Sequence, residues 1–221
     1  MNILVIGDTA NLAECEQKFG HNHEFILAND HREAQILLQT YDLIFDFIID
    51  EDPYQFEIYT NHGGSVFLNT AKISLAQLIQ PFLPLPKGKF FGFNGVPTFL
   101  PLPLFEVSLY KSEDRAALQE HCKSLNTAYK IVDDRVGLIT LRIISMIINE
   151  AYFTVQERTA TEEDIELAMK LGTNYPYGPF EWARRIGIKH VYEVLEALYD
   201  DTKDGRYKIC PALKKQYLAS A

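Results

Sequence analysis

Short apolar runs alternate with amphipathic segments over the first 134 residues. The apolar runs predict strands at residues 2–6, 24–28, 42–49, 65–68, 89–93, 104–110 and 128–132. The amphipathic segments predict helices at residues 12–19, 31–39, 54–59, 74–80 and 113–125. Strands that recur with intervening helices are typical of parallel crossovers, so we expect an α/β fold with a doubly wound, Rossmann-like parallel sheet.

The pattern changes to helices alone after Asp134. This change predicts two domains, at residues 1–134 and 135–221. Residues 135–157 are apolar on nearly every side, as in a helix that is packed from several directions. Burying such a helix in a monomer of this size is difficult, so we expect it to pair with a second copy of the chain.

Capping residues predict where the later helices begin and end. Thr161, with Asp164 three positions on, predicts a helix start, and Gly172 predicts a left-handed stop. Gly178-Pro179 predicts another start, because proline is tolerated in a first turn. A last helix is predicted at residues 188–199, with one apolar face made of Val191, Val194, Leu195 and Leu198.

The composition is that of an ordinary globular protein. The chain has 221 residues, 47% of them hydrophobic, a formal net charge of −9 and a pI near 5.2. This balance disfavours a general nucleic-acid or anionic-membrane surface. The apolar stretch at residues 136–148 is interrupted by Arg142 and is too short to cross a bilayer. Three widely spaced cysteines predict neither a disulfide framework nor a zinc site, and they favour a reducing cytoplasm: Cys15, Cys122 and Cys210.

Two groups of polar residues bear on possible chemistry. The six histidines lack a ligand spacing on any one element, so we expect no metal site. The acidic run of Asp46, Asp50, Glu51 and Asp52 is consistent either with a paired-carboxylate site or with a charged strand end. The sequence favours the second interpretation.

The segment TEEDIELAMKLGTNYPYGPFEWARRIG, at residues 161–187, resembles the C-terminal signature of the 3-hydroxyacyl-CoA dehydrogenase family. That signature ends a helix with Leu-Gly, turns through a YPMGPFEL-like loop and continues as a helix. Its glycines and prolines fix a turn between packed helices, so the match concerns the fold and not the chemistry. Arg184 departs from the family, which usually has an aspartate there.

A second resemblance lies at residues 89–110, KFFGFNGVPTFLPLPLFEVSLY. The catalytic histidine of the family falls on Asn94, and the glutamate that orients it falls on Glu106. In the family the histidine takes the proton of the 3-hydroxyl while hydride passes to NAD. Asn94 cannot take up a proton, although its amide can hydrogen-bond a hydroxyl or carbonyl oxygen. The resemblance therefore implies a reacting centre at Asn94 and Glu106 that lacks its base.

Two further active-site positions of the family differ. LNTAKIS at residues 68–74 resembles the family's SNTSSL, with Ala71 where the family has a substrate-contacting serine. GLITLR at residues 137–142 resembles GFxxNR, with Leu141 where the family has an active-site asparagine. Loss of a positioned general base alone removes on the order of 10²–10⁴-fold in rate. We therefore expect the family reaction to be weak or absent.

The cofactor end is altered as well. IGDTANL resembles the Gly-x-Gly-x-x-Gly turn that holds the pyrophosphate of NAD, but only Gly7 is kept, and Thr9 and Leu12 replace the later glycines. After the second strand, Asn29 or Asp30 is placed to meet a ribose hydroxyl. We assign the cofactor contacts that NAD would make to three residues: Gly7, Asp30 and Asn69.

The family's long helical hairpin over coenzyme A is also reduced, to residues 31–41. The resemblance thus implies a reduced Rossmann-like domain followed by a small all-α dimerisation domain, a homodimer, and a ligand that is an acyl-CoA or 3-hydroxy acid of fatty acid metabolism. Two functions stay open. One is an oxidoreductase of the 3-hydroxyacyl-CoA type with Glu106 and Asn94 at its centre. The other is a non-catalytic binding or assembly module that keeps the fold.

Overall fold

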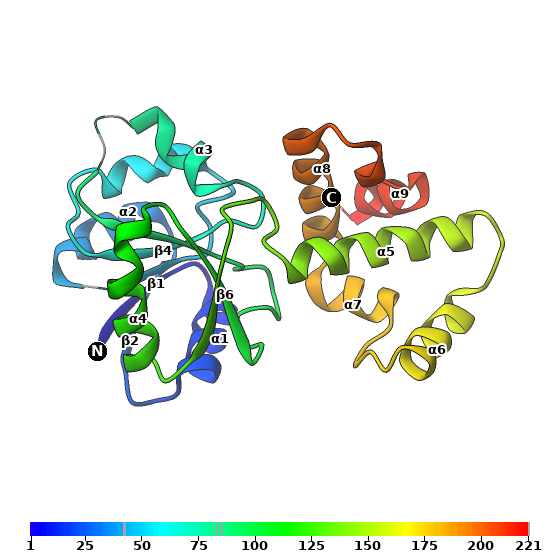
Figure 1. Cartoon of the computed structure of the whole chain (residues 1–221), viewed down its shortest axis with the longest axis horizontal. Helices are drawn as coiled ribbons and strands as arrows, with labels where there is room; N and C mark the ends of the chain where they lie inside the picture. The colour runs from blue at the N-terminus through cyan, green and yellow to red at the C-terminus, as the bar shows by residue number, and fades with distance from the viewer. Residues whose placement is uncertain (42, 83, 85, 221) are drawn as a thin grey trace. The chain divides into compact units, whose positions relative to one another are not determined.

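The chain divides into two compact units, Met1–Leu138 and Ile139–Ala221. The computed structural model describes residues 1–41, 43–82, 84 and 86–220 (Figure 1). The division falls four residues after the predicted boundary at residue 134. The first residue of the strand predicted at 42–49 lies outside the described part of the chain.

The first unit is built on a seven-stranded sheet with the strand order β2-β1-β3-β4-β5-β6-β7. Five neighbouring strands are parallel, in the order of a reduced Rossmann-like fold: β2 (Glu24–Ala28), β1 (Asn2–Ile6), β3 (Leu43–Asp46), β4 (Ser65–Asn69) and β5 (Lys89–Phe93). The last two are β6 (Leu104–Leu109) and β7 (Ala128–Val132). The expected doubly wound sheet is thus confirmed for five strands.

The direction of β6 differs from that expectation. β6 runs antiparallel to β5, and β7 runs parallel to β6. The segment between β5 and β6, residues 94–103, contains turns and no helix. Because a parallel return needs a crossover of a dozen or more residues, this short link allows only the antiparallel direction.

Helices cover both faces of this sheet (Figure 1). On one face α1 (Thr9–Phe19) and α4 (Arg115–Ser124) bury a phenylalanine-rich core, in which the rings of Phe45 and Phe67 stack with centroids 4.7 Å apart. On the other face lie α2 (His31–Leu37), the 3₁₀ segment η2 (Pro53–Tyr59) and α3 (Leu75–Ile79). The predicted helix at 54–59 is therefore a 3₁₀ helix.

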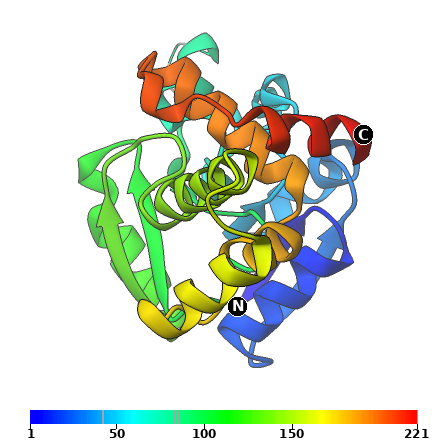
Figure 2. The same ribbon diagram turned by 90° about the vertical axis from the view of Figure 1, so that its right-hand side faces the viewer.

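The second unit consists of helices alone in its described residues. They are α5 (Thr140–Gln156), α6 (Glu162–Gly172), α7 (Pro179–Ile186), α8 (Ile188–Thr202) and α9 (Pro211–Ser220). Figure 2 shows α5 end-on, with the other helices arranged around it. α5 packs on α7, α8 and α9. These contacts bury Leu141, Ile144 and Ile148, while Ile143 stays 51% exposed, and the expected pairing with a second copy remains a prediction.

Two helix ends differ from the sequence prediction. The helix predicted from residue 135 begins only at Thr140, because Gly137 (φ 74°) and Leu138 (φ 47°) are left-handed. Gly172 is the last residue of α6 and not a left-handed stop, a conformation that Asn174 (φ 56°) adopts instead. The start of α6 at Thr161 and the start of α7 after Gly178 are confirmed.

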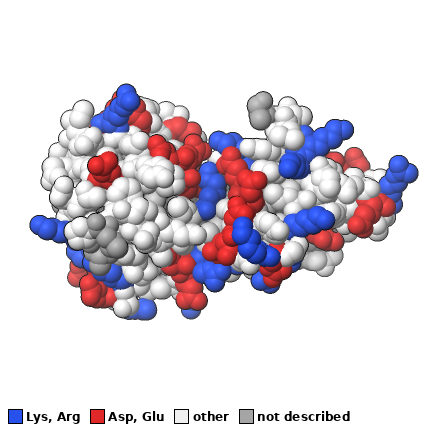
Figure 3. Space-filling model, turned by 90° about the horizontal axis from the view of Figure 1, so that it is seen from above, with Lys and Arg blue, Asp and Glu red and all other residues white. Residues whose placement is uncertain are grey.

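Acidic and basic side chains intermingle on the face drawn in Figure 3. Within the described residues, no helix is long and apolar enough to cross a membrane. The three cysteines, Cys15, Cys122 and Cys210, are free and buried.

Candidate functional site

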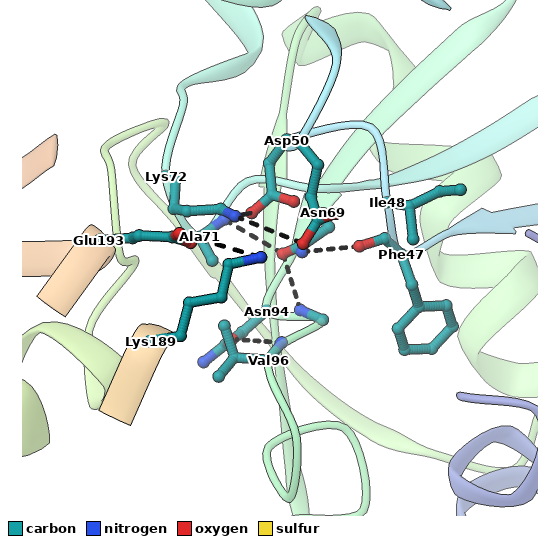
Figure 4. A network of polar contacts seen from close by, with 12 residues as sticks. Phe47, Ile48, Asp50, Asn69, Ala71, Lys72, Asn94, Val96, Lys189 and Glu193 are labelled. Carbon is teal, nitrogen blue, oxygen red and sulfur yellow. Dashed lines mark hydrogen bonds and ion pairs between the residues drawn. The ribbon is translucent and has the colours of Figure 1, made fainter. Parts of the chain in front are cut away.

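The carboxyl ends of the parallel strands meet at one edge of the sheet, where Asn69 joins three of them (Figure 4). Nδ2 of Asn69 donates to the carbonyl oxygen of Phe47 at 2.9 Å. Its Oδ1 accepts from the amides of Gly95 at 2.9 Å and Ala71 at 3.2 Å. Asn69, which the sequence assigns to the cofactor, therefore fixes the loops that follow β3, β4 and β5.

Asn94 and Glu106 flank the last matched pair of the β5–β6 ladder. The antiparallel pairing matches Gly92 with Ser108 and Phe93 with Val107. Asn94 directly follows Phe93, after the end of β5, and Glu106 directly precedes Val107 in β6. The roles that the resemblance implies for the two residues remain predictions.

The Asn94 side chain is only 7% exposed. Its Oδ1 accepts from the amide of Val96 at 3.1 Å, which fixes the orientation of the side chain (Figure 4). Its Nδ2 is buried and has no hydrogen-bond partner. Because leaving a buried donor unpaired costs on the order of 1–3 kcal/mol, this amide is poised for an acceptor oxygen.

Close packing explains the glycine at position 92 of β5. A Cβ on Gly92 would lie 2.3 Å from Oγ of Ser108 and 2.6 Å from Oγ1 of Thr70. Any larger residue would push β4, β5 and β6 apart. Gly92 therefore allows the close packing of β5, the strand that directly precedes Asn94.

Lys72 and Asp50 form a buried ion pair that sequence reasoning missed (Figure 4). Nζ of Lys72 lies 3.6 Å from Oδ2 of Asp50, whose side chain is 2% exposed. Burial raises the pKa of Asp50 to about 7, against the opposing charge of Lys72. The available signal was a lysine in an apolar strand-end segment, but only the fold brings it to Asp50.

Asp46, from the same acidic run, serves a different purpose. Its Oδ2 hydrogen-bonds Nε2 of His31 at 2.9 Å and accepts from the Tyr59 hydroxyl at 2.8 Å. Burial disfavours the charged imidazole, but the hydrogen bond and charge of Asp46 outweigh it, so the pKa of His31 is raised. This buried cluster ties α2 and η2 to β3.

The turn after β1 is closed by its own side chains. Oδ1 of Asp8 accepts from the amides of Ala10 at 2.8 Å and Asn11 at 2.9 Å, and Oδ1 of Asn11 accepts from the amide of Asp8 at 2.9 Å. A Cβ on Gly7 (φ 157°) would lie 2.3 Å from Oδ1 of Asn11. This reciprocal cap uses helix amides of the kind that bind a nucleotide phosphate.

The residues after β2 are engaged in the same way. Asp30 caps α2, because its Oδ1 accepts from the amides of Arg32 and Glu33, each at 2.9 Å. The amide and the Nδ2 of Asn29 donate to Oε2 of Glu33 at 2.8 Å and 3.0 Å. The turn at Gly7 therefore does not fit the pyrophosphate of NAD as it stands, whereas Asp30 keeps a second carboxylate oxygen that can accept from a ribose hydroxyl.

The signature turn of the second unit has a structural explanation. Oε1 of Glu166 accepts from the amides of Phe180 at 2.7 Å and Glu181 at 2.9 Å, which caps α7. A Cβ on Gly178 would lie 2.0 Å from Oε2 of Glu166. Leu141 of α5 is fully buried in place of the family's polar residue. In the described part of the chain, no group of three or more His, Cys, Asp or Glu is placed to hold a metal ion.

Comparison with known proteins supports the resemblance. Residues 137–220 match the family model of the 3-hydroxyacyl-CoA dehydrogenase C-terminal domain. The chain is 39% identical over 87 residues to the 3-hydroxyadipyl-CoA dehydrogenase of Escherichia coli K12, which covers 39% of this chain and 18% of that protein. It is 33% identical over 129 residues to the 3-hydroxybutyryl-CoA dehydrogenase of Bradyrhizobium diazoefficiens, which covers 56% of this chain and 44% of that protein. The chain thus matches less than half the length of either relative.

The fold has close counterparts among solved structures. The (S)-3-hydroxybutyryl-CoA dehydrogenase PaaH1 from Ralstonia eutropha superposes with a TM-score of 0.73 at 20% identity, over 99% of this chain and 94% of that one. At this level of identity the likeness concerns the fold. Taken together, the chain resembles the 3-hydroxyacyl-CoA dehydrogenases in both of its units.

Proposed function

Because the chain resembles the 3-hydroxyacyl-CoA dehydrogenases, we propose that it binds a 3-oxoacyl- or 3-hydroxyacyl-CoA ester and that its NAD-dependent oxidation of the ester is weak or absent. The observation that carries this proposal is Asn94, a buried amide with an unpaired Nδ2 in the place of the catalytic histidine. The amide can donate to the 3-oxygen of the ester, but it cannot accept a proton.

The cost of replacing the histidine sets the scale of the loss. A positioned general base contributes about 10²–10⁴-fold in rate. Glu106 remains in β6, but with Asn94 in place of the histidine there is no imidazole for it to orient. Within the first unit, Ala71 also replaces a serine that contacts the substrate in the family. Effects at one site do not simply multiply.

In the family reaction NAD supplies the hydride acceptor. The side chains at the turn after β1 do not fit its pyrophosphate, because Asp8 caps the helix amides there. What the chain's own residues supply is on the substrate side: a fixed amide donor at Asn94, held by the Val96 amide.

Thermal unfolding with and without ligand tests the proposal. A ligand at 100 times its dissociation constant that binds only the folded chain adds about 2.7 kcal/mol of stability. We expect acetoacetyl-CoA to raise the melting temperature and free coenzyme A to raise it less. If neither compound changes the melting temperature at saturating concentration, the chain does not bind an acyl-CoA ester and the proposal fails.

A second candidate is a non-catalytic assembly module that acts as a homodimer through its helical unit. The observation that favours it is on α6, where Leu167 is 60% exposed and Leu171 is 77% exposed. These residues lie four positions apart and therefore share one face of the helix. Sedimentation equilibrium of the wild type and of Leu167→Glu/Leu171→Glu tests it. A wild type that is monomeric at high micromolar concentration excludes the homodimer.

A further inference from the structure

The turn after β1 has the helix amides that a nucleotide phosphate would need, but a side chain of the turn already accepts their hydrogen bonds. The first four amides of a helix have no partner within the helix, and a phosphate at a helix N-terminus binds them. In α1 the amides of Ala10 and Asn11 both point at Oδ1 of Asp8. We propose that Asp8 takes, within the chain, the position of a nucleotide phosphate, and that the first unit therefore binds no dinucleotide.

The charge at this turn works in the same direction. Asp8 brings a carboxylate to the positive end of the α1 dipole, where a phosphate would otherwise be favoured. A pyrophosphate entering the turn would meet the like charge of Asp8.

The space beside Gly7 is also filled. A glycine at this position lets a pyrophosphate approach the backbone closely. Here the Asn11 side chain lies where a Cβ on Gly7 would be, 2.3 Å from its Oδ1. It is held there by the hydrogen bond from the Asp8 amide at 2.9 Å. The same pair of side chains therefore takes both the amides and the approach path.

The place of the second dinucleotide contact is not closed. An acidic residue after β2 accepts from the ribose hydroxyl in the Rossmann fold. Asp30, the acidic residue at this place, caps its own helix through Oδ1 alone, and a carboxylate has a second oxygen that can accept. The obstacle to a dinucleotide therefore lies at the phosphate and not at the ribose.

Isothermal titration with NADH tests the inference by binding and not by activity. The matched control is Thr9→Gly/Leu12→Gly, which restores the glycine pattern and leaves the cap intact. The opened variant adds Asp8→Ala and Asn11→Ala. We expect the wild type and the control to bind NADH at least about 100-fold more weakly than the opened variant. The inference is wrong if the wild type or the control binds NADH as tightly as the opened variant, or if the opened variant has no higher affinity for NADH than the control.

Removal of the cap also removes a contribution to helix stability, so a gentler variant accompanies it. Asp8→Asn in the Thr9→Gly/Leu12→Gly background keeps a capping oxygen and removes only the charge. We expect an affinity between those of the control and the opened variant. Equal affinity for the control and the Asp8→Asn variant would overturn the role of the charge even if the opened variant does not fold. Because the readout is nucleotide binding, these outcomes are independent of whether the chain binds an acyl-CoA ester.

Discussion

Glu166 lies against Gly178 so closely that a Cβ on the glycine would be 2.0 Å from the carboxylate Oε2. The carboxylate is held there by two amides of α7. The signature by which the second unit resembles its family is therefore a helix cap between α6 and α7. It is a determinant of the fold, in agreement with the expectation from its glycines and prolines.

Gly178→Ala should destabilise the second unit by about 1–3 kcal/mol, because the Cβ displaces a charged cap that satisfies two amides. The measurement is urea unfolding followed by fluorescence of Trp182, the single tryptophan, which lies on α7 itself. Gly205→Ala is the control, since nothing lies within 4 Å of its Cβ. Equal stability of the two variants would contradict this explanation of the signature.

Gly172→Ala should stabilise the chain by roughly 0.5–1 kcal/mol, because Gly172 is helical and a Cβ there meets nothing within 4 Å. The sequence prediction of a left-handed stop gives the opposite sign, since alanine is strained in that conformation. The same unfolding measurement decides between them. A loss of stability would restore the left-handed interpretation.

Asn94→Asp should lower the affinity for acetoacetyl-CoA by about tenfold or more. The variant keeps the oxygen that accepts from the Val96 amide and replaces the unpaired Nδ2 donor with an anionic oxygen. Calorimetric titration of the ester into wild type and variant measures the change. The control is Asn22→Asp, at an exposed position of the turn between α1 and β2. Unchanged affinity of the Asn94 variant would remove Asn94 from the binding site.

The Asp50 carboxyl should make stability depend on pH between about 4 and 7. Burial raises its pKa in the folded chain to about 7, against the charge of Lys72, while an unfolded aspartate titrates near 4. The folded chain thus keeps this proton to a higher pH than the unfolded chain does. The contribution of the protonated Asp50 to the free energy of unfolding is full below pH 4 and is lost as pH rises to 7. Asp50→Asn, which has no such proton, should flatten this slope in urea unfolding followed by circular dichroism.

Two features define the controls for this slope. Asp133, an exposed aspartate after β7, provides the variant Asp133→Asn, which should keep the wild-type slope. Asp46 raises the pKa of His31 despite burial, so the stability that His31 contributes is also lost as pH rises. We assign to His31 the slope that remains above pH 6.5 in Asp50→Asn. A slope in Asp50→Asn equal to that of the wild type over pH 4–7 would contradict the raised pKa.

Local patterns predicted the elements better than the contacts between them. β2, β5 and β7 match their predicted ranges because each is a short apolar run with turn residues on both sides. The late start of α5 was missed, since hydrophobic periodicity does not register the left-handed backbone at Gly137 and Leu138. α9 was not predicted, because its residues carry little amphipathic pattern.

The same contrast holds for the candidate site, where family motifs were recognised and side-chain contacts were not. The placement of Asn94 and Glu106 at one centre came from motif spacing, and it remains a prediction; the β5–β6 ladder ends one residue short of each of them, at Phe93 and Val107. The cap of α1 was missed, although an aspartate followed three residues later by asparagine was its signal. The pair of Lys72 with Asp50 joins residues far apart in the chain, so only the sheet brings them together.

The most direct test of the proposed function is the rate at which the intact chain forms NADH from 3-hydroxybutyryl-CoA and NAD. If the family reaction is weak or absent, as we propose, this rate is at least about 10²–10⁴-fold below that of an enzyme with its general base in place. Asn94→His, which restores an imidazole at this position, should stay slow while the Asp8 cap is closed. A wild-type turnover of about 1–10³ per second, the range of ordinary enzymes, would contradict the account.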